Sequence, residues 1–193
     1  MSIVVLGINH KSAPLDVIER VSISDDVLAK SLHGLVSRDH VRETVVLSTC
    51  NRTEVYVIAE KFHGAFADVR DFFCELSGLS VEELQPHFYS QHDDAAVSHL
   101  FEVASGLDSA VLGETEILGQ VRDAWDKART ETTARTLLNM LFRHALEVGK
   151  RARTETSISR STASVSHAAV EMATDILGTM SGRRVLVIGA GDM

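Results

Sequence analysis

The chain has 193 residues, of which 45% are hydrophobic and 24% charged, enough to bury a core and to form one complete domain with part of another. Two prolines, twelve glycines and the lack of an internal repeat exclude a disordered chain, a collagen and a solenoid. The net charge of -8 argues against a general nucleic-acid-binding protein.

The N-terminal segment MSIVVLGINHKS contains an apolar run too short for a signal-peptide core or a membrane span, and no basic residue precedes it. We therefore expect a cytoplasmic protein that does not associate with membranes. The two cysteines, Cys50 and Cys74, form neither a C-x-x-C pair nor a zinc pattern, and a reducing compartment keeps them as thiols. The histidines show no ligand spacing, so the sequence predicts no metal site.

The predicted elements change in character along the chain. A strand rich in β-branched residues is predicted at Ile3–His10, followed by a helix whose N-terminal cap is Ser24. Two further strands are predicted at Thr44–Ser48 and Glu54–Ala59. Apolar spacing then predicts helices at Phe62–Leu76, Ala95–Ala104, Ile117–Arg129, Leu137–Arg153 and Ser164–Leu177. The sequence therefore predicts an α+β fold over residues 1–155, with an antiparallel sheet covered by helices and a helical subdomain.

Charge is unevenly distributed. Residues 121–160 carry nine lysines and arginines against five acids, a local balance of +4 that leaves -12 for the remaining chain. Such a run is commonly a solvated helix surface, but it is also typical of a face that binds anions. Both interpretations stay open at this point.

The last residues, GRRVLVIGAGDM, are typical of a turn, a buried parallel strand and a glycine loop. Gly189 and Gly191 after a strand begin the G-x-G-x-x-G pattern, in which glycines let a pyrophosphate approach the backbone at a helix N-terminus. Gly189 and Gly191 are equally typical of an ordinary connection between a strand and a loop that binds no nucleotide. Because the acidic residue that holds the ribose does not follow, we expect little cofactor binding by this stretch alone.

The segment VVLSTCNRTEVYVIA places Cys50 in a polar turn between two apolar runs. Cys74, beside Phe72 and Phe73, is typical of a buried structural cysteine. Cys50 differs because its neighbours are polar, and a cation two residues away, Arg52, is expected to favour the thiolate. These residue types leave two interpretations open, a nucleophile and an incidental turn cysteine.

Five segments of the chain, in order, resemble the N-terminal part of glutamyl-tRNA reductases: GINHKSAPLDVIER, LSTCNRTEVY, GLDSAVLGETEILGQVRDA, GKRARTETSIS and VLVIGAG. The resemblance implies a three-domain dimeric enzyme that uses NADPH to reduce glutamate attached to tRNA(Glu) to glutamate-1-semialdehyde, the first step of tetrapyrrole and heme synthesis. In this chain it implies a catalytic domain at 1–155, the start of a connecting helix at 156–182, and the first strand and glycine loop of a truncated NADPH-binding domain at 183–193. It further implies a homodimer through a C-terminal domain and a downstream aminomutase as a partner.

The resemblance also implies roles for individual residues. Cys50 is expected to attack the aminoacyl ester and form a thioester, with His99 near it as a second catalytic residue. The residues expected to bind the substrate are Thr49, Asn51, Arg52, Ser109, Glu114, Thr115, Glu116 and Gln120. The residues expected to contact NADPH in the complete enzyme are Gly189, Ala190, Gly191, Asp192 and Met193.

Two other kinds of function stay open. A cysteine-dependent hydrolase would use Cys50 and His99 to release free glutamate, which a truncated reductase could also do if water resolved the thioester. A non-catalytic module that senses a cofactor would use the terminal strand without turnover.

Overall fold

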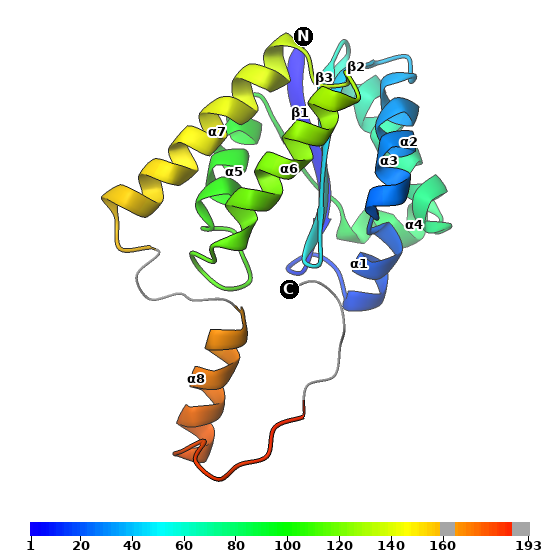
Figure 1. Ribbon diagram of the computed structural model, residues 1–193. Helices are drawn as coiled ribbons and strands as arrows, with labels where there is room; N and C mark the ends of the chain where they lie inside the picture. The colour runs from blue at the N-terminus through cyan, green and yellow to red at the C-terminus, as the bar shows by residue number, and fades with distance from the viewer. Residues whose placement is uncertain (159–164, 187–193) are drawn as a thin grey trace.

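The computed structural model of the protein describes residues 1–158 and 165–186 (Figure 1). Its elements in chain order are β1 (Ser2–Asn9), α1 (Leu15–Val21), α2 (Asp25–Val36), β2 (Val41–Thr49), β3 (Arg52–Ala59), α3 (Phe62–Ser77), α4 (Val81–Leu84), a 3-10 turn (Gln85–His87), β4 (Tyr89–His92), α5 (Asp94–Ser105), α6 (Glu116–Thr130), α7 (Thr136–Glu155) and α8 (Val165–Leu177). No helix in the described part of the chain is both long enough and apolar enough to cross a membrane.

The four strands form one antiparallel sheet in the order β2-β3-β1-β4. Helices α1, α2 and α3 pack on one face, and α5 and α7 pack on the other, so that the sheet is the middle layer (Figure 1). Helix α6 runs along the edge strand β2 and covers it. A covered edge strand cannot pair with another chain, which protects the sheet from aggregation.

The core lies on both faces of β1 and β3, whose side chains are almost all buried. On the face beneath α7, the ring of Tyr56 meets Phe142 edge to face, with centroids 5.4 Å apart. Because successive strand residues point to opposite faces, Arg52, Glu54 and Tyr56 lie on the same face as Phe142. This arrangement places charged groups inside the layer between the sheet and the helices.

The predicted α+β fold with an antiparallel sheet is confirmed, and each strand and helix predicted up to residue 177 corresponds to an observed element within a few residues. The short elements α1, α4 and β4 were not predicted. Strand β4 has only the residues YSQH, which show little apolar alternation, and its pairing with β1 is what defines it.

The start of α7 depends on a distant carboxylate rather than on a local cap. Glu43 on β2 accepts hydrogen bonds from the backbone N–H groups of Arg135, Leu137 and Leu138, at 2.9, 3.2 and 2.9 Å. These groups belong to the first turn of the helix and have no partner within it. The buried carboxylate therefore joins α7 to the sheet and also complements the positive end of the helix dipole.

The C-terminal predictions fall largely outside the described residues. Helix α8 corresponds to the helix predicted at Ser164–Leu177, while residues 183–186 are exposed and form neither strand nor helix. The predicted glycine loop, including all five residues expected to contact a cofactor, lies outside the described ranges. The domain boundaries at 155 and 182 stay predictions.

Candidate active site

Cys50 lies at the exposed end of the β2–β3 hairpin. The strands pair up to Thr49 and Arg52, so Cys50 and Asn51 alone form the turn. The Asn51 N–H donates to Thr49 Oγ1 at 3.2 Å, and the Asn51 carbonyl accepts from the backbone N–H of His10 at 2.9 Å. The turn is thus held by polar contacts on both sides, while the thiol itself reaches solvent.

The strand that follows the turn carries a buried polar network on its inner face. Glu54 is fully buried and accepts four hydrogen bonds: from Arg52 Nη1 at 2.8 Å, from Tyr56 Oη at 2.5 Å, from Tyr89 Oη at 2.5 Å, and from the His99 ring at 2.9 Å. A buried carboxylate is costly unless its oxygens are satisfied, and these donors satisfy both oxygens. The network therefore fixes the positions of four side chains from the two strands β3 and β4 and from α5.

The protonation states in this network follow from its contacts. Burial by itself disfavours the ionised carboxyl, but the hydrogen bond from His99 and the charge of Arg52 outweigh it and lower the pKa of Glu54 to about 2. Burial would also lower the pKa of His99, yet the hydrogen bond and charge of Glu54 raise it above its ordinary value. Because His99 Nε2 faces the Glu54 carboxylate, the geometry places a proton on Nε2. Nδ1 is the ring nitrogen that does not contact Glu54.

Gly7 on β1 makes room for this network. It pairs with Glu54 on one side and with Tyr89 on the other. A Cβ atom at this position would lie 2.7 Å from Tyr89 Oη and 2.9 Å from Glu54 Cγ, closer than packed atoms approach. A glycine inside the strand is therefore required for Tyr89 and Glu54 to meet.

A second carboxylate, Asp108, lies on the other side of Arg52. Arg52 Nη1 donates to Asp108 Oδ2 at 2.9 Å and Nη2 donates to the Asp108 carbonyl, while Lys11 Nζ contacts the same side chain at 2.5 Å. The ligand atoms of Glu54, His99 and Asp108 lie within 4.8 Å of one another, a spacing that could suit a metal ion. The Arg52 guanidinium already supplies a cation between the two carboxylates, so this cluster is better described as an ion-pair network.

The connection between α5 and α6, residues 106–115, forms the wall beside the hairpin. Gly106 and Gly113 have positive φ angles of 79° and 77°, and the Gly113 N–H donates to the Gly106 carbonyl at 2.8 Å. Arg153 on α7 donates to the carbonyls of Ala104 and Glu114, at 2.7 and 3.0 Å. The loop is therefore fixed at both ends.

Two buried polar atoms near the hairpin have no hydrogen-bond partner among the described residues: Ser109 Oγ in this loop, and His10 Nδ1. Burial, together with the charges of Arg52 and Lys11, lowers the pKa of His10, which keeps its ring neutral at pH 7. Buried polar groups are nearly always paired in folded proteins. Atoms of this kind beside an exposed thiol mark places where a polar ligand can bind.

The expectation that Arg52 favours the Cys50 thiolate is wrong. Burial, followed by the charges of Glu114 and Glu116, raises the pKa of Cys50 above its ordinary value. Arg52 has no such effect because its side chain is 1% exposed and its charge is compensated by Glu54 and Asp108. The resting cysteine is therefore a thiol at neutral pH.

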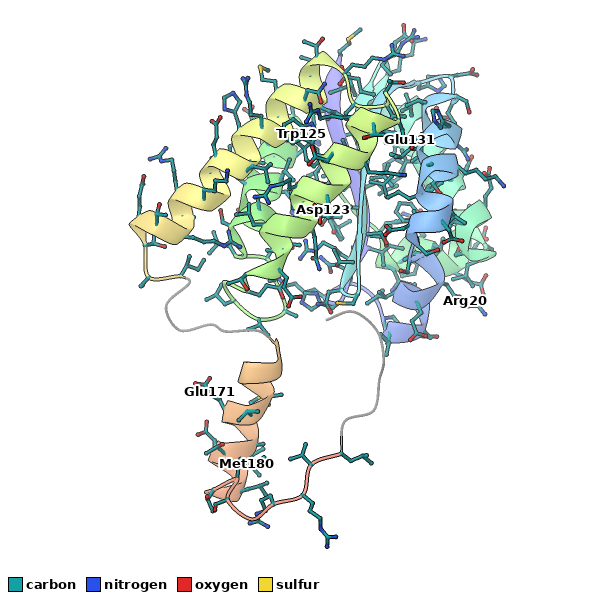
Figure 2. The ribbon with its side chains drawn as sticks, viewed as in Figure 1. Arg20, Asp123, Trp125, Glu131, Glu171 and Met180 are labelled. Atoms are coloured by element: carbon teal, nitrogen blue, oxygen red, sulfur yellow. The ribbon has the colours of Figure 1, made fainter. Side chains whose placement is uncertain are left out.

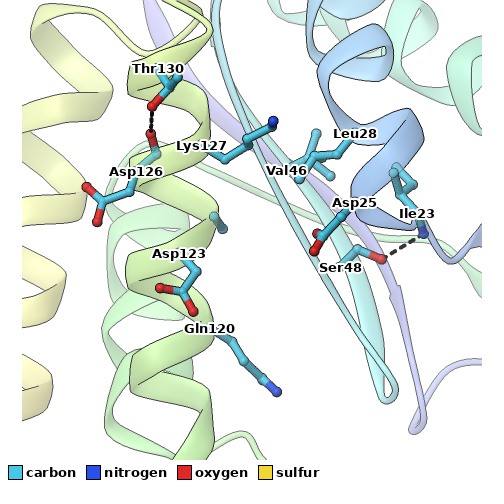
Figure 3. A pocket seen from close by; sticks show the side chains of 11 residues that line it. Ile23, Asp25, Leu28, Val46, Ser48, Gln120, Asp123, Asp126, Lys127 and Thr130 are labelled. Carbon is cyan, nitrogen blue, oxygen red and sulfur yellow. Dashed lines mark hydrogen bonds between the residues drawn. The ribbon is translucent and has the colours of Figure 1, made fainter. Parts of the chain in front are cut away.

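A groove of about 560 Å³ lies between α6, β2 and α2 (Figure 3). Ser48 and Gln120 lie at one end of it, and Ser48 Oγ accepts a hydrogen bond from the Ile23 N–H at 2.9 Å. Its lining includes the acids Asp25, Asp123 and Asp126 and the single cation Lys127. The groove is predominantly acidic, which disfavours phosphate groups there.

The predicted site residues are distributed over neighbouring parts of this end of the molecule. Thr49, Asn51 and Arg52 belong to the hairpin, His99 to α5, and Ser109, Glu114 and Thr115 to the α5–α6 connection, while Glu116 and Gln120 lie on α6. Arg153 and Ile158 approach this loop, and Gly113 permits the approach because the Ile158 carbonyl would be 2.2 Å from an added Cβ. No atom of the described residues lies within 4 Å of a Cβ added at Gly119.

Sequence reasoning missed Glu54, Tyr56, Tyr89, Asp108 and His10. The alternation of Arg52, Glu54 and Tyr56 in RTEVYV is a signal that could have found Glu54 and Tyr56, because period-two spacing places these polar residues on one face of the strand and Thr53, Val55 and Val57 on the other. Tyr89 and Asp108 carry no comparable local signal.

An exposed cysteine two residues along the chain from Arg52, a member of the buried network of His, Glu, Tyr and Arg side chains, is a candidate site for nucleophilic chemistry. Residues 6–156 match the family described as Glutamyl-tRNAGlu reductase, N-terminal domain. The chain belongs to this family.

Individual relatives give the same assignment. The chain is 45% identical over its whole length to a glutamyl-tRNA reductase of Pelobacter propionicus and 45% identical to one of Bacillus subtilis, covering 44% and 42% of those proteins. It is similar to the solved structure of glutamyl-tRNA reductase from Methanopyrus kandleri, with a TM-score of 0.69 and 35% identity over 98% of this chain and 44% of that one. The chain thus spans less than half the length of these relatives.

Proposed function

We propose that this chain forms the part of a glutamyl-tRNA reductase that accepts the glutamyl group from tRNA(Glu) onto Cys50. The observation that carries the proposal is the exposed thiol in a two-residue turn, next to the buried Glu54–His99 network. Thiols are suited to acyl transfer because sulfur is a strong nucleophile and because a thioester accepts hydride more readily than an ester does.

In the proposed first step, Cys50 loses its proton and its sulfur attacks the carbonyl carbon of the aminoacyl ester. The bond between that carbon and the terminal ribose oxygen of the tRNA breaks, and the ribose oxygen takes up a proton. The products are a thioester on Cys50 and a free tRNA hydroxyl group. Because the pKa of Cys50 is raised, the chemistry needs a neighbouring base or the loss of the negative field of Glu114 when the substrate ammonium group binds.

Other residues in the proposal bind and orient the glutamyl group. Ser109 Oγ is buried without a partner among the described residues, and it supplies a hydrogen bond to the substrate. Arg52 is held by Glu54 and Asp108, so a substrate carboxylate that paired with it would take the place of Asp108, which is the more exposed of the two. His99 is held by Glu54 and polarises the ester or positions water.

NADPH supplies the hydride that converts a thioester to an aldehyde, here glutamate-1-semialdehyde for tetrapyrrole synthesis. The residues proposed to contact it, 189–193, lie outside the described ranges, and we derive no step through it. A homodimer through a C-terminal domain, delivery of the product to an aminomutase and a cytoplasmic location belong to the same proposal for the whole enzyme.

Loss of the ester from glutamyl-tRNA, followed as released tRNA and glutamate, tests the proposal. The parent chain and Cys74→Ser should both cleave slowly, whereas Cys50→Ser should not cleave, because a hydroxyl is a far poorer nucleophile than a thiolate. Equal rates for Cys50→Ser and the parent would remove Cys50 from the mechanism. Continuous release of glutamate without semialdehyde in the full-length enzyme would favour the hydrolase instead, and no ester loss with any variant would favour the non-catalytic module.

A further inference from the structure

A second groove, of about 490 Å³, lies between α6 and α7 on the other side of α6 from the acidic groove. Its lining consists of Trp125, Arg129, Thr136, Asn139, Met140 and Arg143. Trp125 lies on the side of α6 that faces α7 (Figure 2), where its Nε1–H donates to Asn139 Oδ1 at 2.8 Å. The Arg129 guanidinium carbon lies 5.0 Å from the indole centroid, over the ring.

The local excess of positive charge is carried by cations that have no carboxylate partner among the described residues. Of the five acids in residues 121–160, Asp126, Glu131 and Glu155 pair with Arg129, Lys127 and Arg151, and Glu147 contacts the ring of His144. Among the described residues, Arg122, Arg135, Arg143 and Lys150 have no carboxylate within ion-pair distance. Asp123, the remaining acid, lines the acidic groove on the opposite side of α6.

The groove therefore combines Arg143, a cation unpaired among the described residues, with an arginine that stacks on an aromatic ring and pairs with Asp126. RNA-binding surfaces use this combination, because cations neutralise phosphates and because unpaired bases stack on aromatic rings or guanidinium planes. From this juxtaposition we infer that the α6–α7 groove binds the unpaired acceptor end of the tRNA, with one base stacked on the Arg129–Trp125 pair and Arg143 on a phosphate. The inference rests on the proposed function, which supplies tRNA as the partner.

The distances along α6 agree with this placement. Glu116, whose charge acts on Cys50, begins the helix, and Trp125 is nine residues further on, roughly 14 Å at 1.5 Å per residue. Stacked nucleotides rise roughly 3.4 Å each, so this length corresponds to about four nucleotides. A tRNA whose terminal ester lies at Cys50 can thus present its acceptor end to the groove.

Arg151 and Arg153 belong to the basic run of residues 121–160 but not to this surface. Arg151 pairs with Glu155 at 3.0 Å, and Arg153 donates inward to backbone carbonyls. Of the cations in that run, Arg129 and Arg143 line the groove.

Fluorescence tests the inference directly, because Trp125 is the single tryptophan of the chain. Uncharged tRNA(Glu) should quench its emission, and the same tRNA without its CCA end should not. Arg129→Ala should weaken binding roughly fivefold or more, the loss expected for one stacked base. Asp126→Asn breaks the same Arg129–Asp126 ion pair from the other side and should leave binding unchanged or tighter.

Arg143→Gln should reduce the slope of log K against log salt by about 0.7, as one phosphate contact is lost. Lys30→Gln, which also removes one positive charge but at an exposed position of α2, should leave the slope unchanged. Unchanged emission on adding tRNA, or equal quenching by the tRNA without CCA, would overturn the groove assignment. If Cys50-dependent ester loss persists in that case, the proposed function stands and the groove fails. If quenching depends on CCA but no variant or parent cleaves the ester, the groove stands and the proposed chemistry fails.

Discussion

Replacing Glu54 by glutamine tests whether the buried network is a major source of stability. The pKa of Glu54 is about 2 in the folded chain against an ordinary 4.5, which at roughly 1.4 kcal/mol per pKa unit corresponds to about 3 kcal/mol at neutral pH. Breaking one side of a buried ion pair independently costs about 3–5 kcal/mol. For a domain of this size, we expect a melting temperature lower by roughly 6–12 °C.

The pH dependence of this loss separates the charge of Glu54 from its packing. Because the folded pKa is lower than the unfolded pKa, the contribution is complete above pH 4.5 and declines as the pH falls toward 2. The difference in unfolding free energy between parent and Glu54→Gln, measured by urea denaturation, should therefore fall below half its neutral value at pH 3. Glu60→Gln alters an exposed ion pair with Arg42 in the same way and should cost less than about 1 kcal/mol. A Glu54→Gln loss as small as that of Glu60→Gln, or one independent of pH, would refute the reasoning.

Three further predictions follow from the same contacts. The rate of ester loss should keep rising with pH beyond 9.0, because burial and the charge of Glu114 raise the pKa of Cys50. Glu114→Gln should shift this pH–rate profile to lower pH, and coincident profiles for the parent and the variant would contradict the prediction. Gly7→Ala should cost about 1–3 kcal/mol by forcing Tyr89 and Glu54 apart. At the exposed position Gly34 of α2, where nothing lies within 4 Å of the added atom, the control Gly34→Ala should be neutral or stabilising by up to about 1 kcal/mol. Equal effects of Gly7→Ala and Gly34→Ala in thermal melts would be inconsistent with the account. Glu43→Ala should cost about 2 kcal/mol in urea denaturation, since three N–H groups of α7 lose their acceptor, and a loss below about 0.5 kcal/mol would show that water replaces it.

Much of the fold could be predicted because its elements carry local signals. Helix α3 shows the apolar period of an amphipathic helix and ends at Gly78, which has a positive φ of 69°. Strand β4 carries no such signal, because its pairing with β1 depends on residues more than 80 positions away. Likewise, the first turn of α7 depends on Glu43, which no local pattern connects to that helix.

The candidate site divides in the same way. Cys50 could be singled out because polar neighbours surround it in sequence, and its exposure agrees with that reading. The state of its thiol could not be predicted from the nearby Arg52, because proximity in sequence did not reveal that Glu54 and Asp108 compensate the arginine. Charge compensation is a property of the tertiary structure, and sequence spacing alone does not determine it.

The most direct test of the central claim is the detection of the glutamyl thioester itself. The parent chain is mixed with glutamyl-tRNA, quenched in acid, digested with a protease and mapped by mass spectrometry. The account predicts a glutamyl adduct on the peptide that contains Cys50, labile to hydroxylamine, and none on the peptide that contains Cys74. Ester loss from the tRNA without any adduct on Cys50 under these conditions, or an adduct confined to Cys74, would contradict it.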